Sequence, residues 1–229
     1  MIQKLKVDLH THTMEDPSEK INYDATRLID RSSEEGYDVL AITNHYTITY
    51  NQDLVRYAEK KGILLLPGVE ARFSRKHILI INPDFQNIPK NLTLEDLAKI
   101  KDYNNLIIAP HPFFPGGTSL GTMILKHISF FDALEFCHCY NHSINFNKKA
   151  VQAAHRYNMP LIGTSDCHYL WEFGSTYSLV ESEKRPLSII KAIKEGKIEI
   201  RTNPLSMTSM SRIAVNFILA NKLKVSFRI

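Results

Sequence analysis

Short runs of apolar, β-favouring residues recur along the chain, and most of the segments between them are long enough to form one helix. Most of the runs are continuously apolar instead of alternating, which predicts strands that are buried on both faces. The runs cover residues 4–10, 38–43, 62–70, 76–82, 105–111, 132–138 and 160–166.

Segments with helical spacing of apolar residues lie between several of these runs. They cover residues 24–36, 53–62, 93–103, 148–158 and 186–196. Gly36 and Gly62 stand where a helix C-cap is expected, Thr93 suits an N-cap, and Pro186 suits a first helical position. Strands that alternate with helices of about this length predict βα units, a mostly parallel sheet and therefore an α/β fold.

The bulk composition fits one globular domain of 229 residues, with 44% hydrophobic and 23% charged residues. A net charge of +4 favours an anionic substrate, but it is too small to indicate nucleic acid by itself. The three cysteines form no disulfide framework and we see no signal peptide, so we expect a cytoplasmic protein. No apolar run approaches the length of a membrane span, so no membrane contact is expected.

Potential metal ligands follow these strands with unusual regularity. The stretch "DLHTHT" at residues 8–13 places His10 and His12 two residues apart, so that both side chains of an extended chain point the same way. Other predicted strands run into His45, Glu70, His111 and the pair Asp166 and His168, whereas His77 stands at the start of its run. The C-terminal strand ends of an α/β barrel meet on one face, and we therefore predict a metal site there.

Six motifs carry a resemblance to a known family: "DLHTHT", "AITNH", "PGVE", "HILII", "APHP" and "GTSDCH". In this order, over residues 8–168, they resemble the motifs of the PHP (polymerase and histidinol phosphatase) superfamily, and residues 181–198 look like its closing helix. The resemblance implies a distorted, TIM-like (β/α)7 barrel, a cluster of two or three divalent metal ions and, usually, phosphoester hydrolysis. We expect one domain over 1–229, with the residues from about 200 as an extension packed on the barrel.

The resemblance also implies the metal ligands. They are His10, His12, Asp16, His45, Glu70, His77, His111, Asp166 and His168. Asp16 is the least certain match, because Pro17 stands about where the family places an acid and both Glu15 and Glu19 lie nearby. Asn44 replaces a common aspartate. A site rich in histidine and carboxylate suits Zn²⁺, Mn²⁺ or Fe²⁺ better than Mg²⁺ or Ca²⁺.

The chemistry expected of this site is hydrolysis of a phosphomonoester by a hydroxide that bridges two metals. Glu70 is the expected bridging ligand, and Asp166 or His168 is expected to protonate the leaving alcohol. The residues expected to bind the substrate are Arg72, which shares the face of Glu70 if the strand continues, and then Arg75, His138 and His142. The expected partner is a small phosphorylated substrate.

Two other functions stay open from the sequence. One is a phosphodiesterase or exonuclease acting on nucleotides or short nucleic acid, which we do not favour. Only 33 residues separate His77 from His111, so the domain inserted in the nucleotidase branch of the family is absent. The other is a non-catalytic, metal-stabilised interaction module, which the retained ligands argue against. The oligomeric state is not predicted.

The end of the chain predicts a terminal helix that packs on the barrel. Met210, Ile213, Ala214, Phe217 and Ile218 fall on one face of it. Its basic residues also fit a helix that contacts a membrane or nucleic acid, which is the less favoured interpretation. These residues are Arg201, Arg212, Lys222, Lys224 and Arg228.

Overall fold

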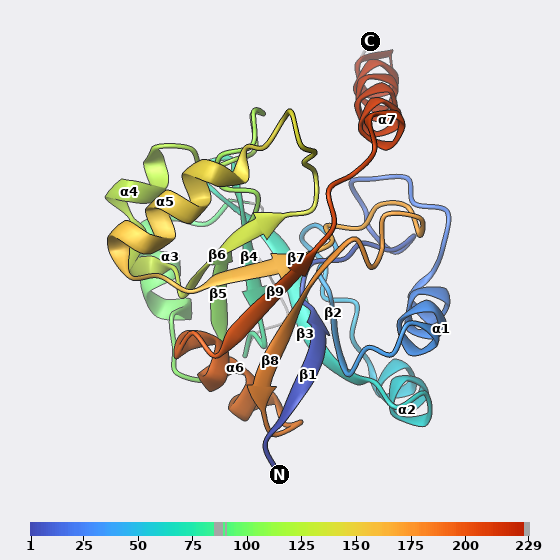
Figure 1. The fold of residues 1–229 in the computed structure, drawn as a ribbon, viewed down its shortest axis with the longest axis vertical. Helices are drawn as coiled ribbons and strands as arrows, with labels where there is room; N and C mark the ends of the chain where they lie inside the picture. The colour runs from blue at the N-terminus through green and yellow to red at the C-terminus, as the bar shows by residue number, and fades with distance from the viewer. Residues whose placement is uncertain (85–88, 90, 227–229) are drawn as a thin grey trace.

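The structure, a computed structural model, describes residues 1–84, 89 and 91–226, with side chains in the last helix described as far as residue 216. Its centre is a sheet of nine strands that curls into a nearly closed barrel (Figure 1). The strands are β1 (Gln3–Asp8), β2 (Val39–Ile42), β3 (Leu64–Phe73), β4 (Lys76–Ile81), β5 (Leu106–Ala109), β6 (Ala133–Cys137), β7 (Leu161–Thr164), β8 (Thr176–Ser182) and β9 (Ile198–Thr202).

The order of the strands across the sheet is β7-β6-β5-β4-β3-β2-β1-β8-β9. The chain that follows β1 meets the chain that follows β7 through a bridge between Thr11 and Cys167, which joins the two ends of the seven-strand ring. The prediction of a barrel-like α/β fold is confirmed. The strand pairing differs from the prediction, because four pairs are parallel and four are antiparallel.

Strand β4 is antiparallel to both of its neighbours, β3 and β5. A two-residue turn at Ser74 and Arg75 joins β3 to β4, and both residues have positive φ, as a tight hairpin turn requires. This reversal explains why His77, unlike the other predicted ligands, stands at the start of its apolar run. The start of β4, with His77, lies at the same end of the barrel as the C-terminal ends of the parallel strands.

Two strands were not predicted, β8 and β9. In β8 the buried positions include Thr176, Ser178 and Ser182, so small hydroxyl side chains occupy positions where an apolar pattern would reveal a strand. Strand β9 alternates apolar and charged residues and, in the described part of the chain, pairs with β8 alone. The two strands extend the sheet beside β1.

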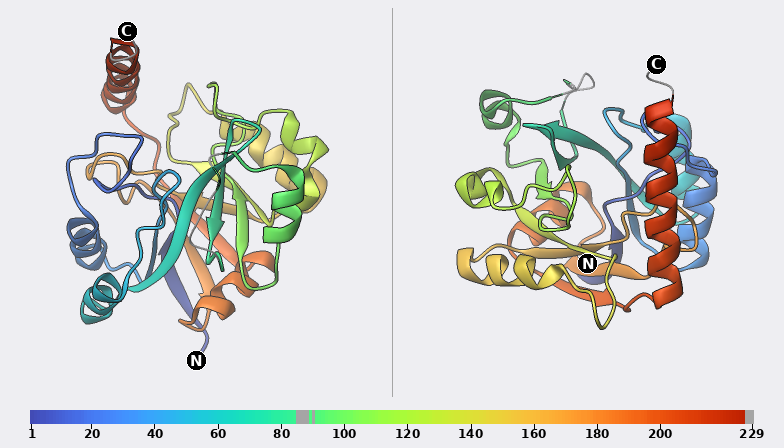
Figure 2. Two further views of the ribbon diagram at one scale, coloured as in Figure 1. Left: turned by 180° about the vertical axis from the view of Figure 1, so that it is seen from behind. Right: turned by 90° about the horizontal axis from the view of Figure 1, so that it is seen from above.

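The helices cover the outside of the barrel in two groups. Helices α1 and α2 pack beside β1–β3, and α3, α4 and α5 pack on the other side (Figures 1 and 2). Asp24 and Asn51 cap the first two helices through their side chains, and Thr93 forms a capping box with Asp96. The bounds are α1 (Ala25–Glu34), α2 (Gln52–Lys60), α3 (Leu94–Ile100), α4 (Met123–Lys126), a 3-10 turn (Ile128–Phe130) and α5 (Asn147–Tyr157).

Helix α6 (Pro186–Lys194) occupies one end of the barrel. Its Ile189, Ile190 and Ile193 are fully buried in a cluster with the inward residues of the strands, such as Leu5 and Val180. Since β1 begins near α6 in Figure 1, the helix fills the barrel at the end where the parallel strands start. The C-terminal ends of those strands are left for the site.

Helix α7 (Met207–Ser226) stands apart from the helices that pack on the sheet (Figure 2). Met210 and Ile213 are half-buried and Ala214 is exposed. Met210 Sδ lies 3.8 Å from Cys139 Sγ, and the Arg212 guanidinium lies 5.0 Å from the Trp171 ring centre. The side chains of Phe217, Ile218, Lys222 and Lys224, and the whole of Arg228, lie outside the described part of the structure.

No helix in the described part of the chain is both long enough and apolar enough to cross a membrane.

Candidate metal centre

The eight clearest predicted ligands come together at the C-terminal ends of the parallel strands. His10 and His12 follow β1, His45 follows β2, and Glu70 lies in β3 where it forms a bridge with His45. His77 begins β4, His111 follows β5, and Asp166 and His168 follow β7. Four groups of three ligand-type side chains place their ligand atoms within 4.8 Å of one another: His10, His12 and Glu70; His12, Asp16 and His45; His12, Asp166 and His168; and His45, Glu70 and His77.

Glu70 lies between two sets of imidazoles. Its Oε2 is 3.1 Å from His45 Nε2 and 3.3 Å from His12 Nε2. Its Oε1 is 2.5 Å from His77 Nδ1 and 3.5 Å from His111 Nε2. Because each oxygen faces different ring nitrogens, this carboxylate has the placement that a bridge between two cations requires.

The other half of the centre is formed by His10, His12, Asp166 and His168. The Nε2 atoms of His10 and His12 face each other at 3.2 Å. Asp166 Oδ1 lies 3.2 Å from His10 Nε2 and 3.5 Å from His12 Nε2. The rings of His12 and His168 are 4.5 Å apart between centres.

The donor set fits divalent transition metals on three observations. Ring nitrogens and carboxylate oxygens converge in groups of three, with little water access because His10 and His12 are fully buried. Among the described residues, the buried His77 Nε2 has no hydrogen-bond partner. Buried polar atoms of this kind are rare unless an ion or another group satisfies them. Imidazole with carboxylate is the ligand chemistry of zinc, manganese and iron sites.

Asp16 lies at the centre, with both oxygens engaged by N–H groups. Its Oδ2 is 3.0 Å from His12 Nδ1 and 2.8 Å from His45 Nδ1, and it accepts the His45 backbone N–H at 2.9 Å. Its Oδ1 accepts the backbone N–H groups of Ser18 and Glu19. In this arrangement Asp16 is an acceptor that fixes two rings and turns their Nε2 atoms toward Glu70.

Glu19 is the nearby acid that contacts His168. Its Oε2 lies 3.0 Å from His168 Nε2. Burial raises the pKa of Glu19, but the hydrogen bond from His168 and the positive charges of His168, His45 and His12 together outweigh that effect and lower the pKa to about 2. Glu15, the alternative to Asp16 in the sequence, instead accepts the backbone N–H of Ala25 at the start of α1.

Sequence reasoning missed Glu135, which is fully buried in β6. Its Oε1 lies 2.7 Å from His10 Nδ1 and accepts from Thr164 Oγ1, while its Oε2 accepts the backbone N–H of His111. These contacts leave His10 Nε2 free to face the centre. The signal was a charged residue in the middle of the run 132–138, between the apolar Leu134 and Phe136.

Two residues of the centre have strained backbones. His111 has φ of 30° and Asp166 has φ of 45°, in the left-handed region that non-glycine residues rarely adopt. Such conformations cost roughly 1–3 kcal/mol each and are concentrated at functional sites. They let the chain turn sharply after β5 and β7, so that both side chains reach the centre.

The charged groups of the centre shift one another's pKa toward the ionised forms. Burial lowers the pKa of His10, but the negative charges of Asp166 and Glu135 outweigh it and raise the pKa well above its ordinary value. Burial raises the pKa of Glu70, but the positive charges of His77 and His45 hold it well below the usual range. Glu70 is therefore a carboxylate at neutral pH.

The four predicted substrate residues lie in different surroundings. Arg72 is half-buried opposite His77 in the β3–β4 pair, with its guanidinium 5.6 Å from the Tyr46 ring centre. Arg75 is exposed in the hairpin turn, and His142 is exposed in the loop after β6. His138 is buried, neither of its ring nitrogens has a partner among the described residues, and burial lowers its pKa to about 4.

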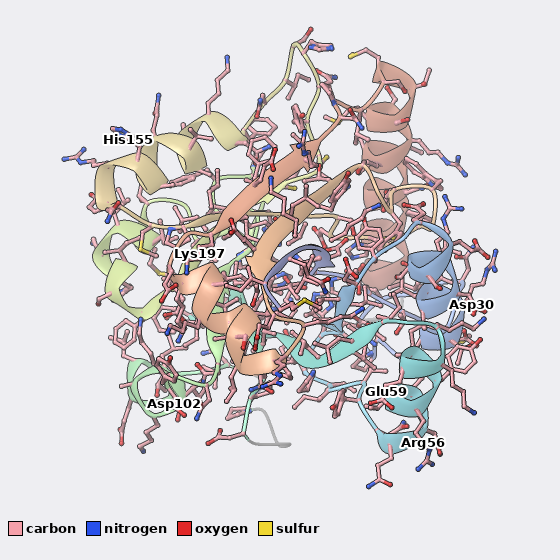
Figure 3. All side chains as sticks on the ribbon, turned by 60° about the horizontal axis from the view of Figure 1, so that its bottom comes forward. Asp30, Arg56, Glu59, Asp102, His155 and Lys197 are labelled. Carbon is pink, nitrogen blue, oxygen red and sulfur yellow. The ribbon has the colours of Figure 1, made fainter. Side chains whose placement is uncertain are left out.

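Histidines outside the motifs lie away from the centre. His155 projects from α5 into solvent (Figure 3), and His127 packs against Phe73 at the end of α4. The three cysteines, Cys137, Cys139 and Cys167, are buried free thiols.

The fold and the site define the class of protein as an α/β barrel with clustered histidine and carboxylate side chains, and comparison with known proteins identifies the family. A sequence profile of the family described as PHP-associated matches residues 145–198. The chain is 30% identical over 131 residues to the uncharacterized protein MJ1587 of Methanocaldococcus jannaschii, covering 52% of this chain and 75% of that protein. The chain belongs to the PHP superfamily.

Solved structures with lower identity share the fold. PsfC from Pseudomonas syringae superposes with a TM-score of 0.65 at 16% identity, over 96% of this chain and 99% of that one. The lesion-specific endonuclease Q from Pyrococcus furiosus gives 0.58 at 18% identity, over 86% of this chain and 58% of that one. A protein from Bifidobacterium adolescentis, assigned as a metal-dependent phosphoesterase, gives 0.57 at 14% identity, over 82% and 94%.

Proposed function

We propose that this protein is a metal-dependent phosphoesterase and that its preferred substrate is a phosphomonoester. The observation that carries the proposal is the position of Glu70, whose two oxygens face separate sets of imidazoles. Two or three Mn²⁺, Zn²⁺ or Fe²⁺ ions are the cofactors that this donor set suits. Ions at such a centre lower the pKa of a water molecule and neutralise the charge on phosphoryl oxygens.

The chain's own residues then have separate roles. His10, His12, Glu70 and Asp166 form one part of the ligand set, and His77 and His111 complete the other part around Glu70. His45 would hold an ion together with Glu70 and His77, and His168 would hold one together with His12 and Asp166. Asp16 and Glu135 orient the rings that they contact. His168 has 28% of its side chain exposed and Asp166 has 17%, so substrate can reach both residues. The pKa of His168 is raised to about 9, so its ring carries the proton that the leaving oxygen needs.

Arg72 is the residue that we assign to the phosphate. It lies across the strand pair from His77 and on the face of Glu70, and its buried Nε has no partner among the described residues. A guanidinium in this position can grip the phosphoryl oxygens bidentately. His138 lies near Asp166 and Glu135, whose charges act on it, and is neutral at pH 7, so it can bind substrate by hydrogen bonds.

Phosphodiester cleavage is the second candidate, because endonuclease Q shares the fold and one of its structures holds a 27-mer duplex substrate with an abasic lesion at the active site. A monoester and a diester of the same phenol distinguish the two activities. We expect 4-nitrophenyl phosphate to be hydrolysed faster than bis(4-nitrophenyl) phosphate with Mn²⁺, Zn²⁺ or Fe²⁺ supplied separately. The reverse order would favour the diesterase.

Two ligand variants test the site itself. His45→Ala and Asp166→Ala should each lower kcat by about a hundredfold or more, the upper range for disturbing a metal site. His155→Ala, on the exposed face of α5, is the matched control and should match the parent protein (Figure 3). Equal losses in all three variants, or full activity after exhaustive chelation, would contradict the proposal.

A further inference from the structure

Tyr46 is half-buried at the edge of the metal centre, directly after His45. The Arg72 guanidinium carbon lies over the Tyr46 ring, 5.6 Å from its centre, within the range of a cation–π contact. We propose that Tyr46 is a positioning residue for phosphate: the face of its ring holds the Arg72 guanidinium in the orientation that binds the phosphoryl oxygens. The inference rests on the proposed phosphoesterase function and adds a residue to its phosphate site.

The Tyr46 ring is the contact that gives the Arg72 guanidinium its direction. In the described part of the chain, no acidic side chain pairs with Arg72 and none of its guanidinium nitrogens forms a hydrogen bond, although its Nε is buried. A long side chain loses rotamer freedom when it binds a phosphate. A contact that orders the guanidinium beforehand therefore improves the binding of phosphate.

An aromatic ring can hold this arginine without competing with the substrate. A cation over a ring face interacts with the π electrons and leaves its N–H groups free, so they can still make two parallel hydrogen bonds to phosphate. Burial raises the pKa of Tyr46, so the phenol is neutral at pH 7. A carboxylate in the same place would occupy the N–H groups of Arg72 and repel the phosphate.

The backbone at Tyr46 is strained. Its φ is 57°, in the left-handed region that bulky side chains rarely adopt. Its N–H donates to the Glu70 carbonyl at 3.0 Å, and His45 forms a bridge with Glu70 just before it. The strained turn thus follows directly on two residues of the centre and carries the ring to Arg72. Strain of this kind is concentrated at functional sites, where the surrounding structure maintains it.

The chain after Tyr46 is fixed as well. Ile48 packs against a hydrophobic cluster of the core, and Thr49 Oγ1 accepts a hydrogen bond from Asn44 Nδ2 at 2.8 Å. With the backbone held on both sides, the Tyr46 ring keeps its place beside Arg72.

The first test measures hydrolysis of 4-nitrophenyl phosphate by the protein supplied with Mn²⁺. Tyr46→Leu should raise KM by about twofold to thirtyfold, the range of a cation–π contact, and leave kcat unchanged. Tyr46→Phe should keep the parent KM, because it retains the ring face. In an Arg72→Ala background, Tyr46→Leu should raise KM no further. Tyr50→Leu, which changes an exposed tyrosine of the same loop, is the matched control and should match the parent protein.

A second measurement separates this role from a structural one. Tyr46→Gly should unfold at about the same temperature as the parent, because glycine adopts the left-handed backbone without strain, and it should show the raised KM of Tyr46→Leu. A lower unfolding temperature with an unchanged KM would mean that the ring only packs the fold, and would overturn the inference.

The third test needs no turnover. Binding of inorganic phosphate to the protein supplied with Mn²⁺ is measured by calorimetry, and we expect Tyr46→Phe to bind like the parent and Tyr46→Leu and Arg72→Ala to bind more weakly. Phosphoester hydrolysis with the same KM and phosphate affinity in the parent and Tyr46→Leu would overturn the role of Tyr46 and leave the proposed function standing. Phosphate binding that needs both Tyr46 and Arg72, in a protein that hydrolyses no phosphoester with any metal, would overturn the proposed function and leave an anion site.

Discussion

At the scale of single residues, the centre depends on carboxylates that contact the histidine rings at Nδ1, the ring nitrogen that faces away from the centre. Glu135 contacts Nδ1 of His10, and Asp16 contacts Nδ1 of both His12 and His45. A hydrogen bond to Nδ1 fixes the tautomer and leaves Nε2 with its lone pair toward the centre. The direction of three imidazoles is therefore determined by two acids.

Glu135→Gln tests this arrangement because it keeps the shape and removes the charge. We expect affinity for Mn²⁺ or Zn²⁺ to fall by about 10–100-fold, the usual cost of losing an outer partner of a metal ligand. Titration against a competing chelator measures it. Glu59→Gln, on the exposed surface of α2 (Figure 3), is the matched control, and equal losses in both variants would contradict the role of Glu135.

Arg72→Ala tests phosphate recognition. The expected result is a higher KM for a phosphomonoester with unchanged metal content, and a loss in kcat/KM equivalent to about 2–4 kcal/mol. Arg72→Lys should recover only part of the loss, because an ammonium group cannot reproduce the bidentate contact. If both variants match the parent enzyme, phosphate binding belongs to Arg75, Lys76, His138 or His142.

The clustering of these side chains could be predicted from the sequence, because parallel strands bring their C-terminal ends to one face of the barrel. His77 fits the same rule once β4 is seen to run backwards. Glu135 and Glu19 could not be predicted in this way. Glu135 lies within a strand, and the contact of Glu19 with His168 spans most of the chain.

At the scale of elements, the barrel closes where β7 crosses the β8–β9 pair. Gly163 allows this approach: a Cβ atom there would lie 2.7 Å from Ile200 Cγ2 and 3.1 Å from the Tyr177 carbonyl oxygen. Ser178 Oγ accepts the Gly163 N–H and donates to its carbonyl, each at 2.9 Å. This contact joins β7 to β8, two strands that are not neighbours in the strand order of the sheet.

Gly163→Ala should therefore destabilise the protein. Overpacking of this kind costs about 1–3 kcal/mol, and the Tyr177 carbonyl is backbone that cannot turn aside. Urea unfolding followed by circular dichroism measures the change in the free energy of unfolding. Gly116→Ala, where a Cβ would meet nothing within 4 Å, is the control, and an unchanged Gly163→Ala would show that β7 can shift without cost.

The five main helices could be predicted to within a few residues, because each has a cap or a glycine at its end as well as an apolar face. Strands β8 and β9 could not. Ser178 is buried because it bonds to Gly163, and a polar residue that is satisfied by a distant partner looks like a surface position in the sequence.

At the scale of the whole molecule, the centre joins six strands of the barrel, from the end of β1 to the end of β7. Ions held there should stabilise the folded state, since the unfolded chain offers no such arrangement. At about 100-fold excess over the Kd, the gain is roughly 2.7 kcal/mol. For a chain of this length that corresponds to about 5–10 °C in Tm.

Chelation should accordingly lower the Tm by about this amount, and Mn²⁺ or Zn²⁺ should restore it. Differential scanning calorimetry before and after dialysis against EDTA makes the measurement. The Glu70→Gln variant is the control and should respond less to either treatment. If chelation leaves the Tm of the parent protein unchanged, no ion contributes to its stability.

Helix α6 has a consequence for the order of events in catalysis. Since its isoleucines fill one end of the barrel, substrate can reach Asp166 and His168 only from the opposite end. In the proposed reaction, incoming ester and outgoing phosphate would then use the same passage, one after the other. The next substrate could then enter only after phosphate has left, so product release would limit how soon a new turnover begins.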